Sequence, residues 1–125
     1  MADILTLEEL KNGVWEGIKL QRSLREYSFF QWDGSLFDSD APSQSRIQGV
    51  VQLAQIALSQ GQPFAVDWTL ADNSVRTLTG QDVIEVGLAL TNHITSCHAR
   101  GRQLRAALDA AQTSAEVQAV QWYWP

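Results

Sequence analysis

The fold is decided by residues 29–40, FFQWDGSLFDSD, which read as a β-hairpin that runs directly into the start of a helix. Aromatic and apolar residues on both sides of the Asp33-Gly34 pair favour strands, and this pair suits a two-residue turn because it accepts positive φ. Phe29 and Phe30 are adjacent, so they point to opposite faces of the hairpin and both faces need cover. The stretch therefore predicts a fold that mixes α and β structure.

Upstream of the hairpin, the sequence predicts one helix from about Leu7 to about Glu26. Thr6-Leu7-Glu8-Glu9 has the form of a capping box, and apolar residues then recur at helical spacing. Gly13 and Gly17 lie four residues apart on one helix face. Either they mark the close approach of another backbone, or the helix tolerates their cost.

Downstream of the hairpin, the sequence predicts a second helix. Asp40 or Ser39 can cap it, Pro42 suits its first turn, and Gly61 is a natural stop. Apolar residues at helical spacing predict a broad buried face on this helix, made of Ile47, Val50, Val51, Ala54, Ala57 and Leu58.

A second hairpin and a long third helix follow. Alternating residues from Phe64 to Leu78 surround a turn at residues 71–74, and Thr79-Gly80-Gln81-Asp82 has the pattern of a helix cap. An apolar stripe continues without proline to about residue 111, which is roughly 45 Å of helix, although Gly101 could kink or end it. Part of so long a helix is expected to project or to pair with a partner helix. The predicted class is α+β, with two antiparallel hairpins in one small sheet, helices packed on it and a long C-terminal helix.

The C-terminal segment is rich in aromatic residues. A capping box at residues 113–116 precedes a short helix, and the chain ends Trp122-Tyr123-Trp124-Pro125. These aromatic side chains either fold back onto the core or offer a binding surface. We expect the partner-binding surface to combine this end with the long helix, and we assign to it Leu104, Leu108, Trp122, Tyr123 and Trp124.

Composition bounds the class of protein. A chain of 125 residues is expected to form one domain, residues 1–125. Its net charge of −5 argues against nonspecific binding to nucleic acid or to an anionic membrane. The N-terminus has neither a basic start nor a long apolar run, so we expect no signal peptide, no membrane span and synthesis in the cytosol.

His93, Cys97 and His98 are the only residues that resemble a metal cluster. His93 and Cys97 are four residues apart and can share a helix face, a spacing that suits two zinc ligands. Third and fourth ligands are not evident, however, and Cys97 also falls on the apolar stripe, where a small buried side chain is normal. A small enzyme or metal-binding protein built on these residues stays an alternative, but we expect no enzyme, metal or cofactor.

Several segments together resemble a known family: residues 15–22, 30–34, 37–40 (FDSD), 46–49 (RIQG), 68–73 (WTLADN) and 93–100. The chain is similar, from about residue 11 to about 122, to a domain of unknown function encoded by phages and prophages. That domain occurs alone or in proteins from tail-fibre and tail-fibre-assembly regions.

The resemblance implies a bacteriophage tail protein, associated with the fibre or the baseplate, that binds other tail proteins and is part of the virion. The alternative that it implies is a tail-fibre assembly chaperone that is not retained in the particle. We also expect the chain to form homo-oligomers, since long helices often associate. It would be made in the host cytoplasm and then reside in the virion tail.

Overall fold

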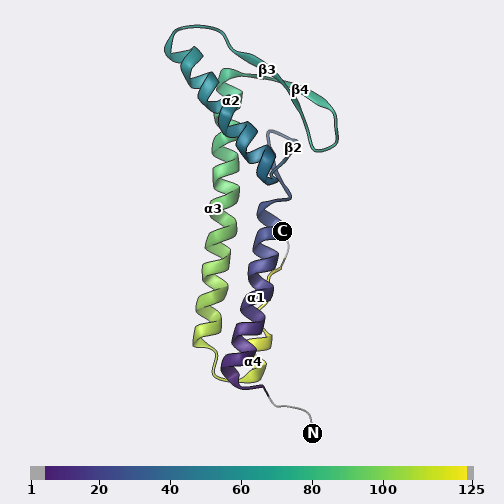
Figure 1. The fold of residues 1–125 in the computed structure, drawn as a ribbon, viewed down its shortest axis with the longest axis vertical. Coiled ribbons are helices and arrows are strands. Elements are labelled where there is room, and N and C mark those ends of the chain that lie inside the picture. The colour runs from purple at the N-terminus through teal and green to yellow at the C-terminus, as the bar shows by residue number, and fades with distance from the viewer. Residues whose placement is uncertain (1–4, 124–125) are drawn as a thin grey trace. The chain divides into compact units, whose positions relative to one another are not determined.

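The computed structural model describes residues 5–123. The elements follow in the order α1 (Leu7–Glu26), β1 (Phe29–Trp32), β2 (Ser35–Asp38), α2 (Ala41–Ser59), β3 (Ala65–Thr69), β4 (Val75–Thr79), α3 (Gly80–Ala110) and α4 (Ser114–Gln118), as Figure 1 shows. They divide into two compact units: unit 1 lies within Met1–Arg25 and Ser96–Pro125, and unit 2 is Glu26–Thr95. The predicted α+β class, the two antiparallel hairpins and the long helix are confirmed.

The first hairpin of unit 2 has the predicted turn. Trp32 pairs with Ser35 and Phe30 pairs with Phe37 across the antiparallel ladder. Asp33 and Gly34 both have positive φ, of 46° and 76°, which is the backbone of a two-residue hairpin turn. The face that carries Phe30 and Phe37 is buried, whereas the opposite face is only partly covered, because Phe29 and Leu36 are 43% and 44% exposed.

The second hairpin, β3 with β4, forms a sheet of its own. Its turn is fixed by Asp72, whose Oδ1 accepts hydrogen bonds from the Ser74 amide and hydroxyl, and these bonds lower the pKa of the carboxyl. The two hairpins are separate two-stranded sheets rather than the single sheet that we expected. One backbone hydrogen bond, from Ala71 N to Leu36 O at 3.0 Å, ties β2 to the β3–β4 turn, which is too little for a continuous ladder.

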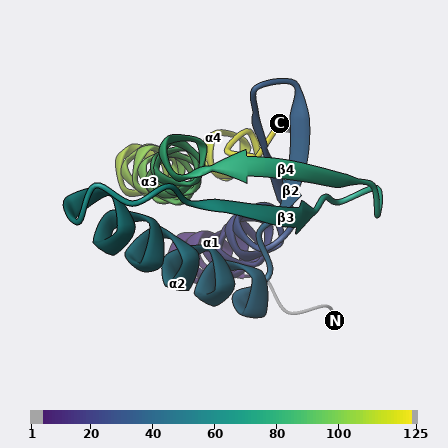
Figure 2. The ribbon, with the colours of Figure 1, turned by 90° about the horizontal axis from the view of Figure 1, so that it is seen from above.

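The core of unit 2 lies between the covered faces of the hairpins and the helices α2 and α3 (Figure 2). Phe30 stacks on Phe37 with ring centroids 5.4 Å apart, and Trp32 meets Phe37 edge to face. On α2 the buried face is narrower than predicted, since Leu58 is exposed. The buried side chains of this cluster are Phe30, Phe37, Ile47, Ala54, Leu70, Leu78, Val83, Val86 and Leu90.

The predicted caps differ between the helices. At α3, Thr79 and Asp82 each accept from the other's backbone N–H, as a capping box requires. At α2, Asp40 takes the N-cap position but its side chain makes no capping hydrogen bond. Ser39 does not cap either, because its buried hydroxyl donates to the Glu26 carbonyl at 2.6 Å. That bond instead satisfies the Glu26 carbonyl at the C-terminal end of α1, where the last carbonyls have no N–H donor within the helix.

At Gly87, α3 lies close against α2 within unit 2. A Cβ atom added at Gly87 would lie 2.7 Å from Val51 Cγ2, which is far inside van der Waals contact. Gly13 differs, because a Cβ atom there would meet nothing within 4 Å. Within residues 5–123, the alternative in which Gly13 and Gly17 receive a neighbouring backbone is therefore not met.

Gly87→Ala is expected to lower the free energy of unfolding by about 1–3 kcal/mol, because α2 and α3 must move apart or Val51 must leave its rotamer. Gly13→Ala is the matched control, and it should raise stability by about 0.5–1 kcal/mol, since alanine is the better helix former. Urea unfolding measures both values. Combining Gly87→Ala with Val51→Ala should restore part of the loss, and the clash argument fails if Gly87→Ala alone is as stable as the parent.

Unit 1 is built from α1, the second part of α3 and α4. The reciprocal hydrogen bonds of Thr6 and Glu9 start α1 as predicted, and α3 continues through Gly101 without ending there. Trp15 carries the guanidinium of Arg105 over its ring at 4.8 Å, with that of Arg22 at 5.9 Å. The buried side chains of its core cluster are Ile18, Leu104, Leu108, Ala111 and Val117.

Candidate functional site

Two of the predicted partner-binding residues lie in the core of unit 1. Leu104 and Leu108 belong to its buried cluster, and Leu108 is only 1% exposed. They pack there with Ile18 of α1 and Val117 of α4. In this structure their own chain covers them, so they do not lie on a surface that a partner can reach. The apolar stripe predicted on α3 is present at these residues, but side chains of the same chain cover it.

The aromatic residues near the C-terminus were expected either to fold back onto the core or to offer a binding surface, and the described ones do one each. Trp122 folds back and packs against the core cluster of unit 1, whereas Tyr123 is exposed. Trp124 lies outside the described residues. The Trp122 indole nitrogen is buried and has no hydrogen-bond partner among residues 5–123. An orphaned donor of this kind is costly unless something supplies an acceptor.

An open groove of about 380 Å³ runs beside Trp122 in unit 1. Its walls come from α1 and from the segment after α4, and its lining residues are Val14, Gly17, Ile18, Gln21, Val120, Gln121 and Trp122. Gly17 leaves one wall without a side chain, which widens the groove. The lining is mostly apolar and contains no charged residue, as suits an apolar partner side chain.

The outer face of α1 continues from this groove. Gly13, Gly17, Leu20 and Leu24 follow one another at spacings of four, three and four residues, so they share one face of the helix. All four are exposed, and Leu24 is 52% exposed. The sequence carried this signal, but we read the glycines without the leucines beyond them. We call Gly13, Gly17, Leu20 and Leu24 the outer face of α1.

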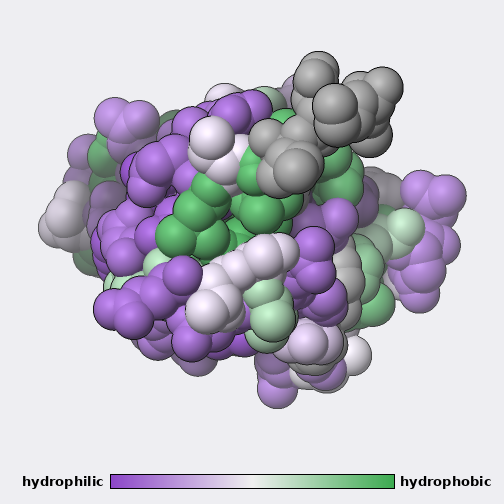
Figure 3. Space-filling model, turned by 90° about the horizontal axis from the view of Figure 1, so that it is seen from below, coloured by the Kyte–Doolittle hydropathy of each residue, from purple (hydrophilic) through white to green (hydrophobic). Residues whose placement is uncertain are grey.

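Hydrophobic side chains also reach the surface at the end of unit 1. Figure 3 looks onto the end that carries α4 and shows a patch of hydrophobic side chains inside a hydrophilic surround. Leu5, at the start of the described chain, is one of the exposed large apolar residues of this unit.

The possible metal ligands do not gather into a site. His93 stacks on Phe30, and its Nε2 lies 3.1 Å from the Glu26 carbonyl oxygen. A carbonyl only accepts, so Nε2 carries a proton and donates. Cys97 is buried. Among residues 5–123 no group of three or more His, Cys, Asp or Glu side chains is placed to hold a metal ion.

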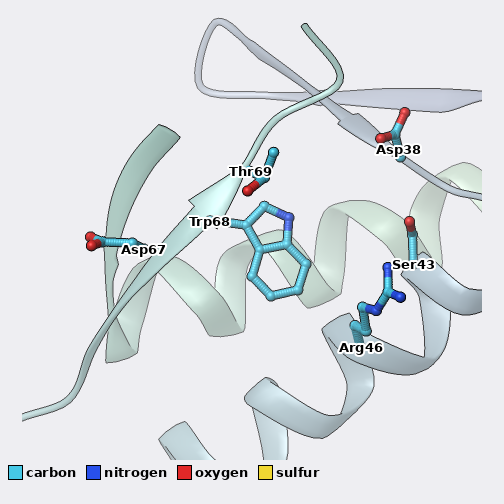
Figure 4. Close-up of a pocket in the computed structure, with 6 residues that line it drawn as sticks. All are labelled: Asp38, Ser43, Arg46, Asp67, Trp68 and Thr69. Carbon is cyan, nitrogen blue, oxygen red and sulfur yellow. The ribbon is translucent and has the colours of Figure 1, made fainter. Parts of the chain in front are cut away.

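Unit 2 has a polar pocket of about 320 Å³, lined by Asp38, Ser43, Arg46, Asp67, Trp68 and Thr69. Figure 4 shows Ser43 and Arg46 extending from α2 on one side and Trp68 on β3 across from them. Asp67 points away from the others and accepts from the Thr77 hydroxyl at 2.6 Å. Three of the segments that carry the family resemblance thus meet here, since they contain Asp38, Arg46 and the Trp68-Thr69 pair. We call this cavity the polar pocket.

Charge is distributed unevenly between the two units. Unit 2 contains eight acidic residues and only two basic ones, Arg46 and Arg76, for a formal charge of −6. The other seven basic and six acidic residues belong to unit 1, for a charge of +1. Arg76 is engaged, because it pairs with Asp33, donates to the Ser35 hydroxyl and lies over the Trp32 ring.

A family described as "Domain of unknown function (DUF4376)" matches residues 9–121. The chain belongs to this family. The DUF4376 match begins inside α1, includes every residue that lines the polar pocket and ends just before Trp122. No curated protein matches the chain, and no solved structure does. None of the helices within residues 5–123 combines the length and the hydropathy that a membrane span needs.

Proposed function

We propose that this chain is a bacteriophage tail protein, associated with the fibre or the baseplate, and that it acts by binding other tail proteins. The observation that carries the binding role is the apolar surface of unit 1. It joins the outer face of α1 to the groove beside Trp122 and to the exposed Tyr123. Aromatic anchors in desolvated pockets dominate the energetics of protein interfaces, and Trp and Tyr are prominent among them.

The outer face of α1 supports a helix-to-helix contact. Each glycine in an exposed helix costs up to about 1 kcal/mol relative to alanine, and nothing within the described chain fills the space beside Gly13 and Gly17. A partner helix would use that space, while Leu20 and Leu24 would extend the seam at heptad-like spacing. The partner is another tail protein or a second copy of the chain.

The tail assignment itself rests on the resemblance of the quoted segments to the phage and prophage domain. An assembly chaperone for the tail fibre would present the same apolar surface, because it too binds fibre protein. The two roles differ in where the protein ends up. A virion component stays in the particle, whereas a chaperone leaves.

Mass spectrometry of purified phage particles, with copy number, tests the proposal. We expect the chain in particles at a symmetric multiple, and Leu24→Glu should lower its copy number at least severalfold because a carboxylate then interrupts the apolar face. Leu53→Glu is the matched control. It is the same substitution at a leucine on α2 of unit 2, away from the proposed surface, and Leu53 is 56% exposed. Normal incorporation of both variants would contradict the assigned surface.

Absence of the chain from particles would overturn the structural role. If it then copurified with fibre protein from lysate, the assembly chaperone would become the answer. If it were in neither place, the tail assignment as a whole would fall, while the stability predictions made for the fold would stand.

A further inference from the structure

We infer that the polar pocket of unit 2 binds a carboxylate of a polypeptide, with the Arg46 guanidinium and the Trp68 indole N–H as its donors. This inference concerns a different surface from the proposed tail contact, and it does not depend on a phage origin. The pocket's volume of about 320 Å³ lies at the lower end of the range of small-ligand sites.

The donors in this pocket have no acceptors of their own. Within residues 5–123 the side chains of Arg46, Ser43 and Trp68 make no hydrogen bond or ion pair. Ser43 and Arg46 are three residues apart on α2, so both reach the same side of the helix. Trp68 lies opposite them, with its indole nitrogen on the side toward Asp38 and Ser43 (Figure 4). A guanidinium, an indole N–H and a hydroxyl therefore converge, and each donates to anionic oxygen.

The charges around the pocket select the kind of anion. Unit 2 has two basic residues, and Arg76 is engaged by its own partners, so Arg46 is the one available to a ligand. The formal charge of the unit as a whole is −6. A phosphate dianion would meet this field and the Asp38 carboxylate in the same pocket. A single carboxylate, with one negative charge, is repelled less than a phosphate dianion. A cationic group next to it on the ligand would pair with the Asp38 carboxylate. The chemistry thus fits a carboxylate beside a basic group.

The strand beside the pocket favours a polypeptide over a free small molecule. In the part of the chain that the structure describes, β3 pairs with β4 alone, so alternate residues of β3 direct backbone N–H and C=O groups away from the ladder. Trp68 and Thr69 of this strand line the pocket. A peptide that places its acidic side chain on Arg46 can bring its own backbone to this strand, which a small carboxylic acid cannot do.

The Trp68 indole resonance in a ¹H–¹⁵N NMR spectrum reports binding directly, and Trp68→Phe assigns it among the five tryptophans. We expect acetyl-Lys-Glu-amide to shift this resonance with a Kd of about 1–10 mM, and acetyl-Lys-Gln-amide to bind at least about tenfold more weakly. Arg46→Gln should weaken the Lys-Glu peptide about tenfold, and Arg46→Lys should restore binding only in part, because an ammonium lacks the planar fork. Arg102→Gln, at an exposed arginine of unit 1, should change nothing.

Acetate and inorganic phosphate separate the sources of the anion. Asp38→Asn should strengthen the binding of acetate, because it removes a negative charge that repels the acetate. It should weaken the binding of the Lys-Glu peptide, because it removes the partner of the peptide's lysine. The inference is overturned if no carboxylate shifts the Trp68 resonance at about 10 mM, if the Lys-Gln peptide binds equally well, or if phosphate binds more tightly than the peptide. Equal binding by Arg46→Gln would likewise remove Arg46 from the site.

Discussion

Replacing Phe37 with alanine is expected to lower the free energy of unfolding by about 3–5 kcal/mol, the largest effect that we predict for unit 2. Phe37 is 0% exposed and lies where both aromatic contacts of the first hairpin meet, with Phe30 stacked on it and Trp32 edge to face. Truncation removes both contacts and leaves a cavity that the short strands cannot close, because Phe37 is held in register opposite Phe30.

The neighbouring residue provides the control. Leu36 is 44% exposed and points to the open face of the same strand, so Leu36→Ala should cost less than about 0.5 kcal/mol. Urea unfolding followed by tryptophan fluorescence measures the free energy of unfolding of both variants. Equal losses for the two substitutions would mean that the alternation of faces along β2 is not as the structure has it.

Local chemistry carried most of the fold prediction. The Asp33-Gly34 turn, the end of α1 at Glu26 and the capping box at Thr79 all depend on residues within four positions of one another, so the sequence displays them directly. The α2 cap was predicted only in part: Asp40 takes the N-cap position, but neither its side chain nor that of Ser39 makes the capping hydrogen bond. The Ser39 hydroxyl is taken by Glu26, thirteen residues away, and a distant acceptor cannot be seen in a local pattern.

Burial was harder to predict than secondary structure. A helix stripe shows which face is apolar, but it does not show what covers that face. Phe29 was expected to need cover and is 43% exposed, whereas Leu104 and Leu108 were assigned to a partner surface and are buried. In each case the outcome depends on which segments pack together across the chain.

The candidate sites show the same limit. The spacing of Gly13, Gly17, Leu20 and Leu24 in the sequence is enough to place them on one face of a helix. The polar pocket could not be predicted in this way, because it brings together Asp38, Arg46 and Trp68 from three segments that only the tertiary structure places side by side.

Leu108→Ala is expected to lower the free energy of unfolding by about 2–5 kcal/mol, since it opens a cavity in the core of unit 1 among Ile18, Leu104 and Val117. Leu24→Ala is its matched control on the outer face of α1. It shortens the same type of side chain at an exposed position and should cost less than about 0.5 kcal/mol. Thermal and urea unfolding of the isolated chain measure both variants.

This pair of variants separates a core leucine from an interface leucine. If Leu108 served a partner, as its place on a long helix suggested, then Leu108→Ala would leave the isolated chain as stable as the parent and weaken only its assembly. The structure leads us to expect the reverse pattern: Leu108→Ala should destabilise the isolated chain, and Leu24→Glu should spare its fold while reducing its incorporation into particles. Stability and assembly would then be carried by different faces of unit 1, one occupied within the chain and the other left open at Gly13, Gly17, Leu20 and Leu24.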